Sequence, residues 1–320
     1  MVVLRERLDL RALPKAELHL HLEATIAADT ARELAARAGL PVPPAGPFGG
    51  QAEFVRAYEG ARDLVRSLDD VRRLAAELAS RQAADGVLWS EVHLAPSTYA
   101  GRLGPADGLV EAFLDGAGHG GAGGRLGLVL GINRGLPVAE AVATVDLALR
   151  WAGRGVVALG IAGDEAAHPL EPFAPVFARA RAAGLPAVPH CGEGTGPAGV
   201  RSALALHPQR LCHGLGAAGE DGLLDELAAR GICLDMAPSS NVALGLVPSL
   251  AEHPLPGLLR RGLEVTVSTD IPGFLGHGLV EELELCRRAW GLDDGELARL
   301  AATSLRRSSV PLDDRILRKS

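Results

Sequence analysis

The sequence predicts an α/β protein, a single (β/α)8 barrel over residues 1–320, from two observations. Short apolar runs alternate with stretches of helical periodicity along the whole chain, and this alternation indicates a parallel sheet. Eight such units occupy about 300 residues, which is typical of a barrel that closes on itself. A hydrophobic content of 48% is sufficient for one large core.

The predicted strands are short apolar runs separated by loops and helical patterns. In the first strand Leu18, Leu20 and Leu22 alternate with polar residues, so the leucines share one face and the polar side chains share the other. The eight predicted strands are residues 16–22, 86–95, 125–133, 155–163, 185–191, 210–214, 232–238 and 264–270.

Helices are predicted between the strands because apolar residues recur at helical spacing in stretches such as 63–85, 138–153 and 171–184. Several of these stretches stop at a glycine, which commonly ends a helix. A doubly wound open sheet is the alternative fold, but it usually carries a glycine-rich phosphate loop after its first strand. Here Glu-Ala-Thr follows the first strand, so the barrel is favoured.

A helical and loop insertion, residues 24–58, follows the first strand, and we expect it to form a lid over the barrel. Part of it is rich in proline and glycine. Phe48, Phe54 and Tyr58 are candidates for the wall of a pocket there, although ordinary packing of a short helix explains them equally well. A run of small residues, 116–124, is interpreted as a flexible loop before the third strand.

The composition argues against several classes of partner. The net charge is −7 and the basic residues are thinly spread, so we expect no nucleic-acid or membrane surface. No run of 18 apolar residues and no signal peptide are found. The four cysteines include no CxxC pair, which argues against a cysteine-based zinc site and fits reduced thiols. We therefore expect a cytoplasmic protein that acts on a small molecule.

Polar side chains with catalytic chemistry lie at the ends of several predicted strands. Active sites of such barrels lie at the carboxyl ends of the strands. A single buried histidine is more often a hydrogen-bonded core residue than a ligand, but six residues at the strand ends of one barrel indicate a shared site. These residues are His19, His21, His190, Glu193, His213 and Asp270.

Four of these residues form a ligand set that suits a metal ion. His19, His21, His190 and Asp270 provide three imidazoles and one carboxylate, which favours Zn²⁺ with a water molecule as the reactive ligand. Zinc lowers the pKa of such a water to about 7. The set does not select strictly among metals, so Fe²⁺ and Mn²⁺ are alternatives.

Glu193 and His213 are candidates for proton transfer. His213 could accept the proton of the water or hold the hydroxide. Glu193 could protonate the substrate if its surroundings keep the carboxyl partly neutral. Some barrel hydrolases bridge two metals with a carbamylated lysine, but the only lysines here, Lys15 and Lys319, lie near the ends of the chain. We therefore expect one zinc ion per chain.

Seven stretches in order along the chain resemble the adenosine deaminase family of metal-dependent amidohydrolases. The resemblance covers nearly the whole chain and implies a TIM barrel with one zinc ion that hydrolytically removes an amino group from a purine-like ring. The stretches are LPKAELHLHLE (13–23), DGVLWSEVHLAP (85–96), GIAGDE (160–165), HCGEG (190–194), RLCHG (210–214), APSSN (237–241) and HPLPGLLRRGLEVTVSTD (253–270).

The resemblance also implies roles for individual residues. The four candidate ligands would bind zinc, Glu193 would protonate the ring nitrogen beside the attacked carbon, and His213 would orient or deprotonate the water. The backbone of Gly163 would hydrogen-bond to the ring. Asp164 and Glu23 would lie against the substrate.

The chain departs from the family pattern at positions that meet the substrate. Ile271 replaces the second aspartate that contacts N7 of the purine, and an unpaired ring nitrogen costs about 1–3 kcal/mol. Glu23 and Ala24 stand where many adenosine-specific members have aspartate and glycine, and His93 stands where arginine is common. We therefore expect a substrate other than plain adenosine, for example a 7-deazapurine or aminodeoxyfutalosine.

Other functions stay open at this stage. The substitution at Ile271 is also compatible with a retained adenosine activity. A second hypothesis is that the same fold and metal hydrolyse a C–N or amide bond in a non-purine ring. A third hypothesis is a non-catalytic binding barrel. The PCxxC pattern that zinc enzymes deaminating nucleic-acid bases carry together with HxE is absent.

Overall fold

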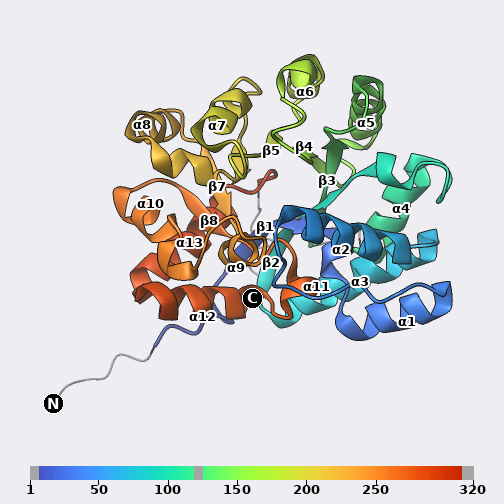
Figure 1. The fold of residues 1–320 in the computed structure, drawn as a ribbon, viewed down its shortest axis with the longest axis horizontal. Coiled ribbons are helices and arrows are strands. Elements are labelled where there is room, and N and C mark those ends of the chain that lie inside the picture. The colour runs from blue at the N-terminus through green and yellow to red at the C-terminus, as the bar shows by residue number, and fades with distance from the viewer. Residues whose placement is uncertain (1–6, 119–124, 312–320) are drawn as a thin grey trace.

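A computed structural model of the chain describes residues 7–118 and 125–311 and confirms the (β/α)8 barrel (Figure 1). Its eight strands are parallel and pair in sequence order. Residues 119–124 of the predicted flexible loop lie outside the described residues. The strands are β1 Lys15–His21, β2 Val87–Leu94, β3 Leu126–Asn133, β4 Val156–Ala162, β5 Ala187–Cys191, β6 Arg210–His213, β7 Cys233–Met236 and β8 Val265–Val267.

The barrel closes between β1 and the segment just after β8. The backbone N–H of Asp270 donates to His19 O at 3.1 Å, and the N–H of His21 donates to Asp270 O at 3.2 Å. Asp270 adopts a left-handed backbone conformation there, with φ of 64°. Closure of the barrel therefore brings Asp270 beside both histidines of β1.

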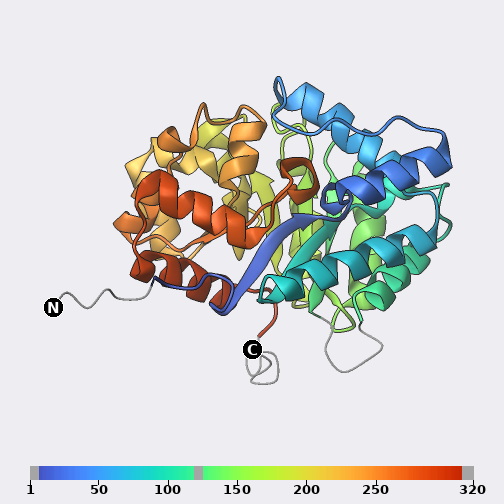
Figure 2. The same ribbon diagram turned by 90° about the horizontal axis from the view of Figure 1, so that it is seen from below.

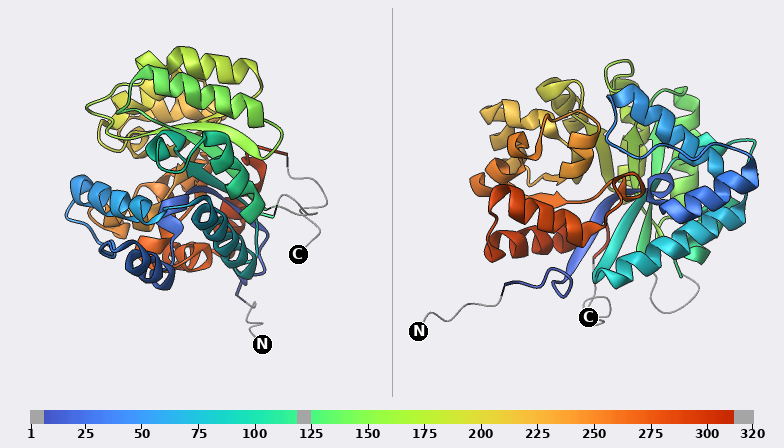
Figure 3. Two further views of the ribbon diagram at one scale, coloured as in Figure 1. Left: turned by 90° about the vertical axis from the view of Figure 1, so that its right-hand side faces the viewer. Right: turned by 60° about the horizontal axis from the view of Figure 1, so that its bottom comes forward.

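Helices surround the strands on the outside of the barrel (Figure 3). The predicted helix 63–85 is wrong at its start, because residues 65–67 are not helical and separate two helices. Ser67 caps the second helix, and its Oγ accepts the N–H of Asp70 at 3.1 Å. The helices are α1 Ala28–Ala38, α2 Gln51–Leu64, α3 Leu68–Ala84, α4 Ala106–Gly116, α5 Val138–Trp151, α6 Ala174–Ala182, α7 Gly196–Leu204, α8 Asp221–Ala229, α9 Pro238–Ala243, α10 Leu255–Arg261, α11 Pro272–Leu275, α12 Leu279–Trp290 and α13 Asp294–Arg306.

The core has two parts. The larger part fills the space between the strands and the surrounding helices. A smaller cluster of apolar side chains comes mostly from the first halves of the strands. Its members are Ala16, Leu18, Trp89, Val129, Val157, Ala158 and Val188. Within the described residues, no helix is both long and apolar enough to cross a membrane.

The insertion predicted over residues 24–58 contains α1, a long loop and the first part of α2. Helices α2 and α11 lie at the same end of the barrel (Figure 2). The N–H of Phe48 donates to Ala243 O at 2.8 Å, which ties the loop to α9. The rings of Phe48, Phe54 and Phe274 lie with centroids 5.5–6.1 Å apart. The loop is therefore packed against the segments that follow β7 and β8.

Candidate active site

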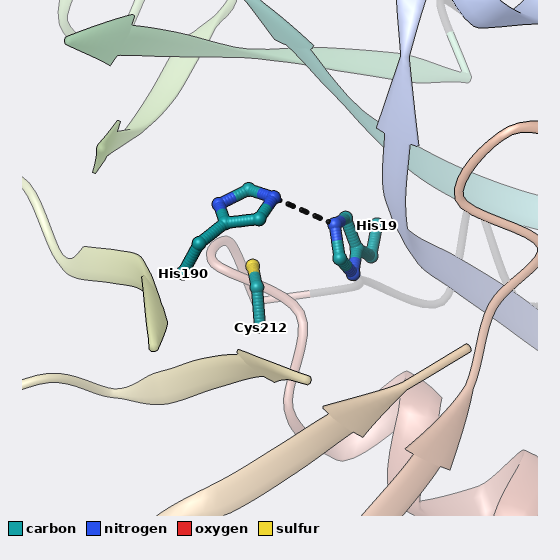
Figure 4. Close-up of side chains that lie close together, drawn as sticks. All are labelled: His19, His190 and Cys212. Atoms are coloured by element: carbon teal, nitrogen blue, oxygen red, sulfur yellow. Dashed lines mark hydrogen bonds between the residues drawn. The ribbon is translucent and has the colours of Figure 1, made fainter. Parts of the chain in front are cut away.

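Four side chains converge at the carboxyl ends of the strands, and we call His19, His21, His190 and Asp270 the mouth cluster. His190 Nε2 lies 3.0 Å from His19 Nε2 and 3.1 Å from His21 Nε2. Asp270 Oδ1 lies 3.4 Å and 3.3 Å from the same two histidine nitrogens. Figure 4 shows His19 of β1 and His190 of β5 pointing toward each other.

Hydrogen-bond partners of His190 and Asp270 turn lone pairs of these two residues toward the mouth cluster. His190 Nδ1 lies 3.2 Å from Ile161 O, and because a carbonyl only accepts, this nitrogen carries the proton and Nε2 presents a lone pair. Ser240 Oγ donates to Asp270 Oδ2 at 2.6 Å, which leaves Oδ1 toward the histidines. A cation among these atoms would accept all four lone pairs, so the donor set fits a tetrahedral metal ion.

Burial keeps these histidines neutral. It lowers the pKa of His21 to about 3 and lowers the pKa values of His19 and His190 well below their usual range. Neutral imidazole is the form that binds a metal. The side chains therefore have the protonation state of ligands at neutral pH.

Cys212 and His93 lie beside the mouth cluster. His19, His190 and Cys212 can offer ligand atoms within 4.8 Å of one another, and Figure 4 shows the Cys212 sulfur near both rings. However, the thiol donates to Val188 O at 3.6 Å, and burial raises its pKa well above the usual range. His93 stacks on His21 with ring centroids 5.0 Å apart. We therefore interpret Cys212 and His93 as residues that pack against the candidate metal ligands and not as ligands themselves.

Glu193 lies in the loop after β5 and its side chain is only 12% exposed. Its Oε1 is 3.3 Å from His213 Nε2. Burial and, to a lesser extent, the charge of Glu165 raise the pKa of Glu193 to about 7, with Arg134 opposing both effects. The carboxyl group is therefore partly protonated at neutral pH, as a proton donor must be.

Glu165 is a residue of the site that the sequence reasoning missed. Its carboxylate accepts the backbone N–H groups of Gly192, Glu193 and Gly194 at 2.7, 3.1 and 3.2 Å. The neighbouring Asp164, predicted to contact substrate, is exposed and accepts two N–H groups of its own turn instead. The acidic pair in GIAGDE was the available signal, but it does not tell which member reaches the β5 loop.

His213 ends β6 with a left-handed backbone, φ 63°. Asn241 Nδ2 lies 2.9 Å from His213 Nδ1, and His253 Nε2 lies 3.0 Å from Asn241 Oδ1. Both partners fall in stretches that resemble the family, yet the sequence did not indicate that they meet. They hold the His213 ring beside His19, whose ring centroid is 4.8 Å away.

Three residues predicted to face the substrate, Glu23, Ile271 and Gly163, have contrasting surroundings. Glu23 is buried, and its two carboxylate oxygens accept the hydroxyls of Tyr58 at 2.8 Å and Tyr99 at 2.5 Å. The Ile271 side chain is fully buried. Gly163 has φ of 117°, and a Cβ there would lie 3.1 Å from Arg134 Cγ, so the position requires glycine.

A (β/α)8 barrel whose mouth gathers neutral histidines, a carboxylate and a second carboxyl group with a raised pKa is typical of metal-dependent hydrolases. The model of the family described as adenosine deaminase matches residues 14–318. The chain belongs to the adenosine deaminase family and is a hydrolytic deaminase that acts on C–N bonds.

Two relatives illustrate the range of the family. The chain is 36% identical over 309 residues to an adenine deaminase from Rhodospirillum rubrum, and the alignment covers 92% of each chain. It is also 36% identical over 311 residues to an aminodeoxyfutalosine deaminase from Streptomyces avermitilis, covering 92% of this chain and 86% of the relative.

Solved structures agree with the fold. An adenine deaminase from Arthrobacter aurescens superposes with a TM-score of 0.85 at 26% identity and 95% coverage of both chains. An amidohydrolase from Burkholderia ambifaria, solved with bound Zn, superposes with a TM-score of 0.83 at 28% identity, covering 95% of this chain and 87% of the other.

Proposed function

We propose that this deaminase uses one zinc ion held by the mouth cluster to remove the exocyclic amino group of an aminated heterocycle other than adenosine. The observation that carries the proposal is the convergence of three histidine Nε2 atoms and one Asp270 oxygen, with contacts of 3.0–3.4 Å, in the same mouth as the carboxyl of Glu193, whose pKa is raised to about 7. The relatives that deaminate adenine and aminodeoxyfutalosine support this class of substrate.

Each polar residue of the site then has a chemical part. Zinc, when bound, supplies the Lewis acidity that makes water nucleophilic near neutral pH. Glu193 donates a proton to the ring nitrogen beside the attacked carbon, which makes that carbon more electrophilic. His213, whose Nε2 lies 3.3 Å from Glu193 Oε1, would orient the water. The backbone N–H of Gly163 binds the ring, and Asp164 lies at the exposed rim of the same loop.

Two buried side chains argue against adenosine. The hydroxyls of Tyr58 and Tyr99 each donate to one oxygen of Glu23, so about half of the lone-pair sites of this carboxylate are engaged before the hydroxyl of a sugar could bind. Ile271 is fully buried and stands where the family pattern has an aspartate, and its apolar side chain could not hydrogen-bond to a purine N7. Lost pairing of a buried nitrogen costs about 1–3 kcal/mol, or roughly ten- to a hundredfold in rate.

We also propose that the protein works in the cytoplasm. Its cysteines are buried free thiols, which fits a reducing compartment.

The test is ammonia release by the zinc-loaded chain from a panel of adenosine, adenine, 7-deazaadenosine, aminodeoxyfutalosine and aminopterins. Glu193→Gln is the control, because it keeps the shape of the side chain and removes the acid. We expect one strong substrate other than adenosine, with ammonia release slowed by about 10²- to 10⁴-fold in the control. Adenosine as the best substrate would contradict the substrate proposal.

A further inference from the structure

His213 is the first member of a chain of hydrogen bonds that ends on the protein backbone. Its Nδ1 lies 2.9 Å from Asn241 Nδ2, and Asn241 Oδ1 lies 3.0 Å from His253 Nε2. His253 Nδ1 lies 3.2 Å from the backbone nitrogen of Leu255. All three side chains are buried, so each polar atom depends on its partner in this chain.

The backbone amide of Leu255 decides the direction of every bond. A backbone N–H only donates, so His253 Nδ1 accepts and carries no proton. The neutral ring of His253 then has its proton on Nε2 and donates it to Asn241 Oδ1. The Asn241 amide nitrogen donates to His213 Nδ1. His213 therefore holds its own proton on Nε2.

Reversing the chain would leave a donor facing a donor. A proton on His213 Nδ1 would require the Asn241 amide to turn, and the turned amide would present its NH2 group to His253 Nε2. His253 would then need a proton on Nδ1, opposite the N–H of Leu255. Opposed donors in a buried site are unfavourable. Trp290 stacks on His253, with ring centroids 5.6 Å apart, and holds the ring in place.

We propose that Asn241 and His253 are positioning residues that hold His213 as a hydrogen-bond donor at Nε2, so that His213 orients the reacting groups and does not accept the proton of the water. His213 Nε2 lies 3.3 Å from Glu193 Oε1. An N–H at this place favours a lone pair on Oε1, so the acid proton of Glu193 resides on Oε2. The proposal rests on the proposed function, in which Glu193 is the proton donor.

The position of the proton is measured directly by ¹⁵N NMR of the histidine rings in the zinc-loaded full chain. The His213 signals are assigned by their loss in His213→Gln. We expect a protonated Nε2 and an unprotonated Nδ1. In Asn241→Asp both carboxylate oxygens accept, so His213 Nδ1 should gain a proton. An unprotonated Nε2 in the wild-type protein would overturn the proposal.

The kinetics of matched variants at His253 test the same series of hydrogen bonds from its far end. His253→Leu removes the donor to Asn241, whereas His253→Gln keeps an amide that can donate. We expect the leucine variant to lose about ten- to a hundredfold in kcat with KM little changed, and the glutamine variant to recover most of the loss. His207→Asn, at an exposed histidine before β6, should keep full activity. Equal kcat values for the leucine and glutamine variants would overturn the proposal.

The two measurements separate this inference from the proposed function. The NMR experiment needs no substrate, so it stays decisive if no member of the panel releases ammonia. An active deaminase with an unprotonated His213 Nε2 would contradict the positioning role alone. If His253→Leu does not fold, Asn241→Asp provides the kinetic and NMR comparison in its place.

Discussion

Two clusters of buried polar side chains occupy the inside of this barrel, and they are built on opposite rules. Arg210, Glu91 and Asp235, which we call the arginine layer, are fully buried. Arg210 lies 2.6 Å from a Glu91 oxygen and 3.2 Å from an Asp235 oxygen. Glu91 also accepts the hydroxyl of Ser309, and Asp235 accepts that of Thr266. Each charge of this layer thus faces an opposite charge or a donor.

The mouth cluster lacks this compensation. His190 Nε2 and Asp270 Oδ1 each lie 3.0–3.4 Å from the Nε2 atoms of His19 and His21, and among the described residues no lysine or arginine side chain pairs with these atoms. The buried polar groups of this barrel therefore divide into two kinds: a satisfied network stabilises the fold, whereas converging acceptors mark a place for a cation. Substitutions in each cluster test this division.

The largest expected effect is on catalysis at the mouth. Glu193→Gln should lower kcat by about 10²- to 10⁴-fold, because the acid that protonates the ring is removed. Steady-state ammonia release measures it. The zinc content of the variant should equal that of the wild-type protein, since Glu193 lies outside the mouth cluster. A variant that keeps its kcat would remove Glu193 from the mechanism.

The arginine layer should respond in stability instead. Arg210→Met leaves Glu91 and Asp235 buried without their cation and should lower the free energy of unfolding by about 3–5 kcal/mol. Urea denaturation measures the loss. Arg306→Met is the matched control, because its exposed pair with Glu264 should contribute less than about 1 kcal/mol. Similar losses in the two variants would show that the layer is not the structural network described above.

A smaller effect is expected where the loop of Glu193 is anchored. Glu165→Gln keeps one acceptor but places an NH2 group against backbone N–H groups of residues 192–194. We expect kcat to fall about ten- to a hundredfold through misplacement of Glu193. Glu171→Gln, an exposed change nearby, serves as the control and should retain full activity. Unchanged kcat in Glu165→Gln would mean that the loop holds its shape without this anchor.

The mildest test is the pH dependence. Glu193 must carry a proton to act, and its pKa is raised to about 7, so kcat/KM should decline as the pH rises through about 7. The same raised pKa means that the folded chain binds this proton more tightly than the unfolded chain. Its contribution to stability is therefore full below the unfolded pKa and is lost as the pH rises through about 7.

In Glu165→Gln the decline of kcat/KM should move to lower pH, because a like charge beside Glu193 is removed. A decline at unchanged pH would rule out this coupling.

Much of the fold and of the site could be predicted because strands and their last residues are local features. Apolar runs identify all eight strands, and the residues of the mouth cluster stand at or just beyond their carboxyl ends. The partners of these residues could not be predicted in the same way. Glu165 meets the loop of Glu193, and His253 meets Asn241, only because the closed barrel brings separate loops together. The break at Ser67 was missed because the helical spacing continues across it.

Zinc titration of the metal-stripped chain tests whether the mouth cluster holds the catalytic cation. The readout is ammonia release from the best substrate of the enzyme. If the mouth cluster holds one catalytic cation, activity rises linearly and stops rising at one equivalent of zinc per chain, and His190→Ala shows no such rise. Full activity in the metal-stripped chain, or a rise in His190→Ala equal to that of the wild-type protein, would contradict the claim.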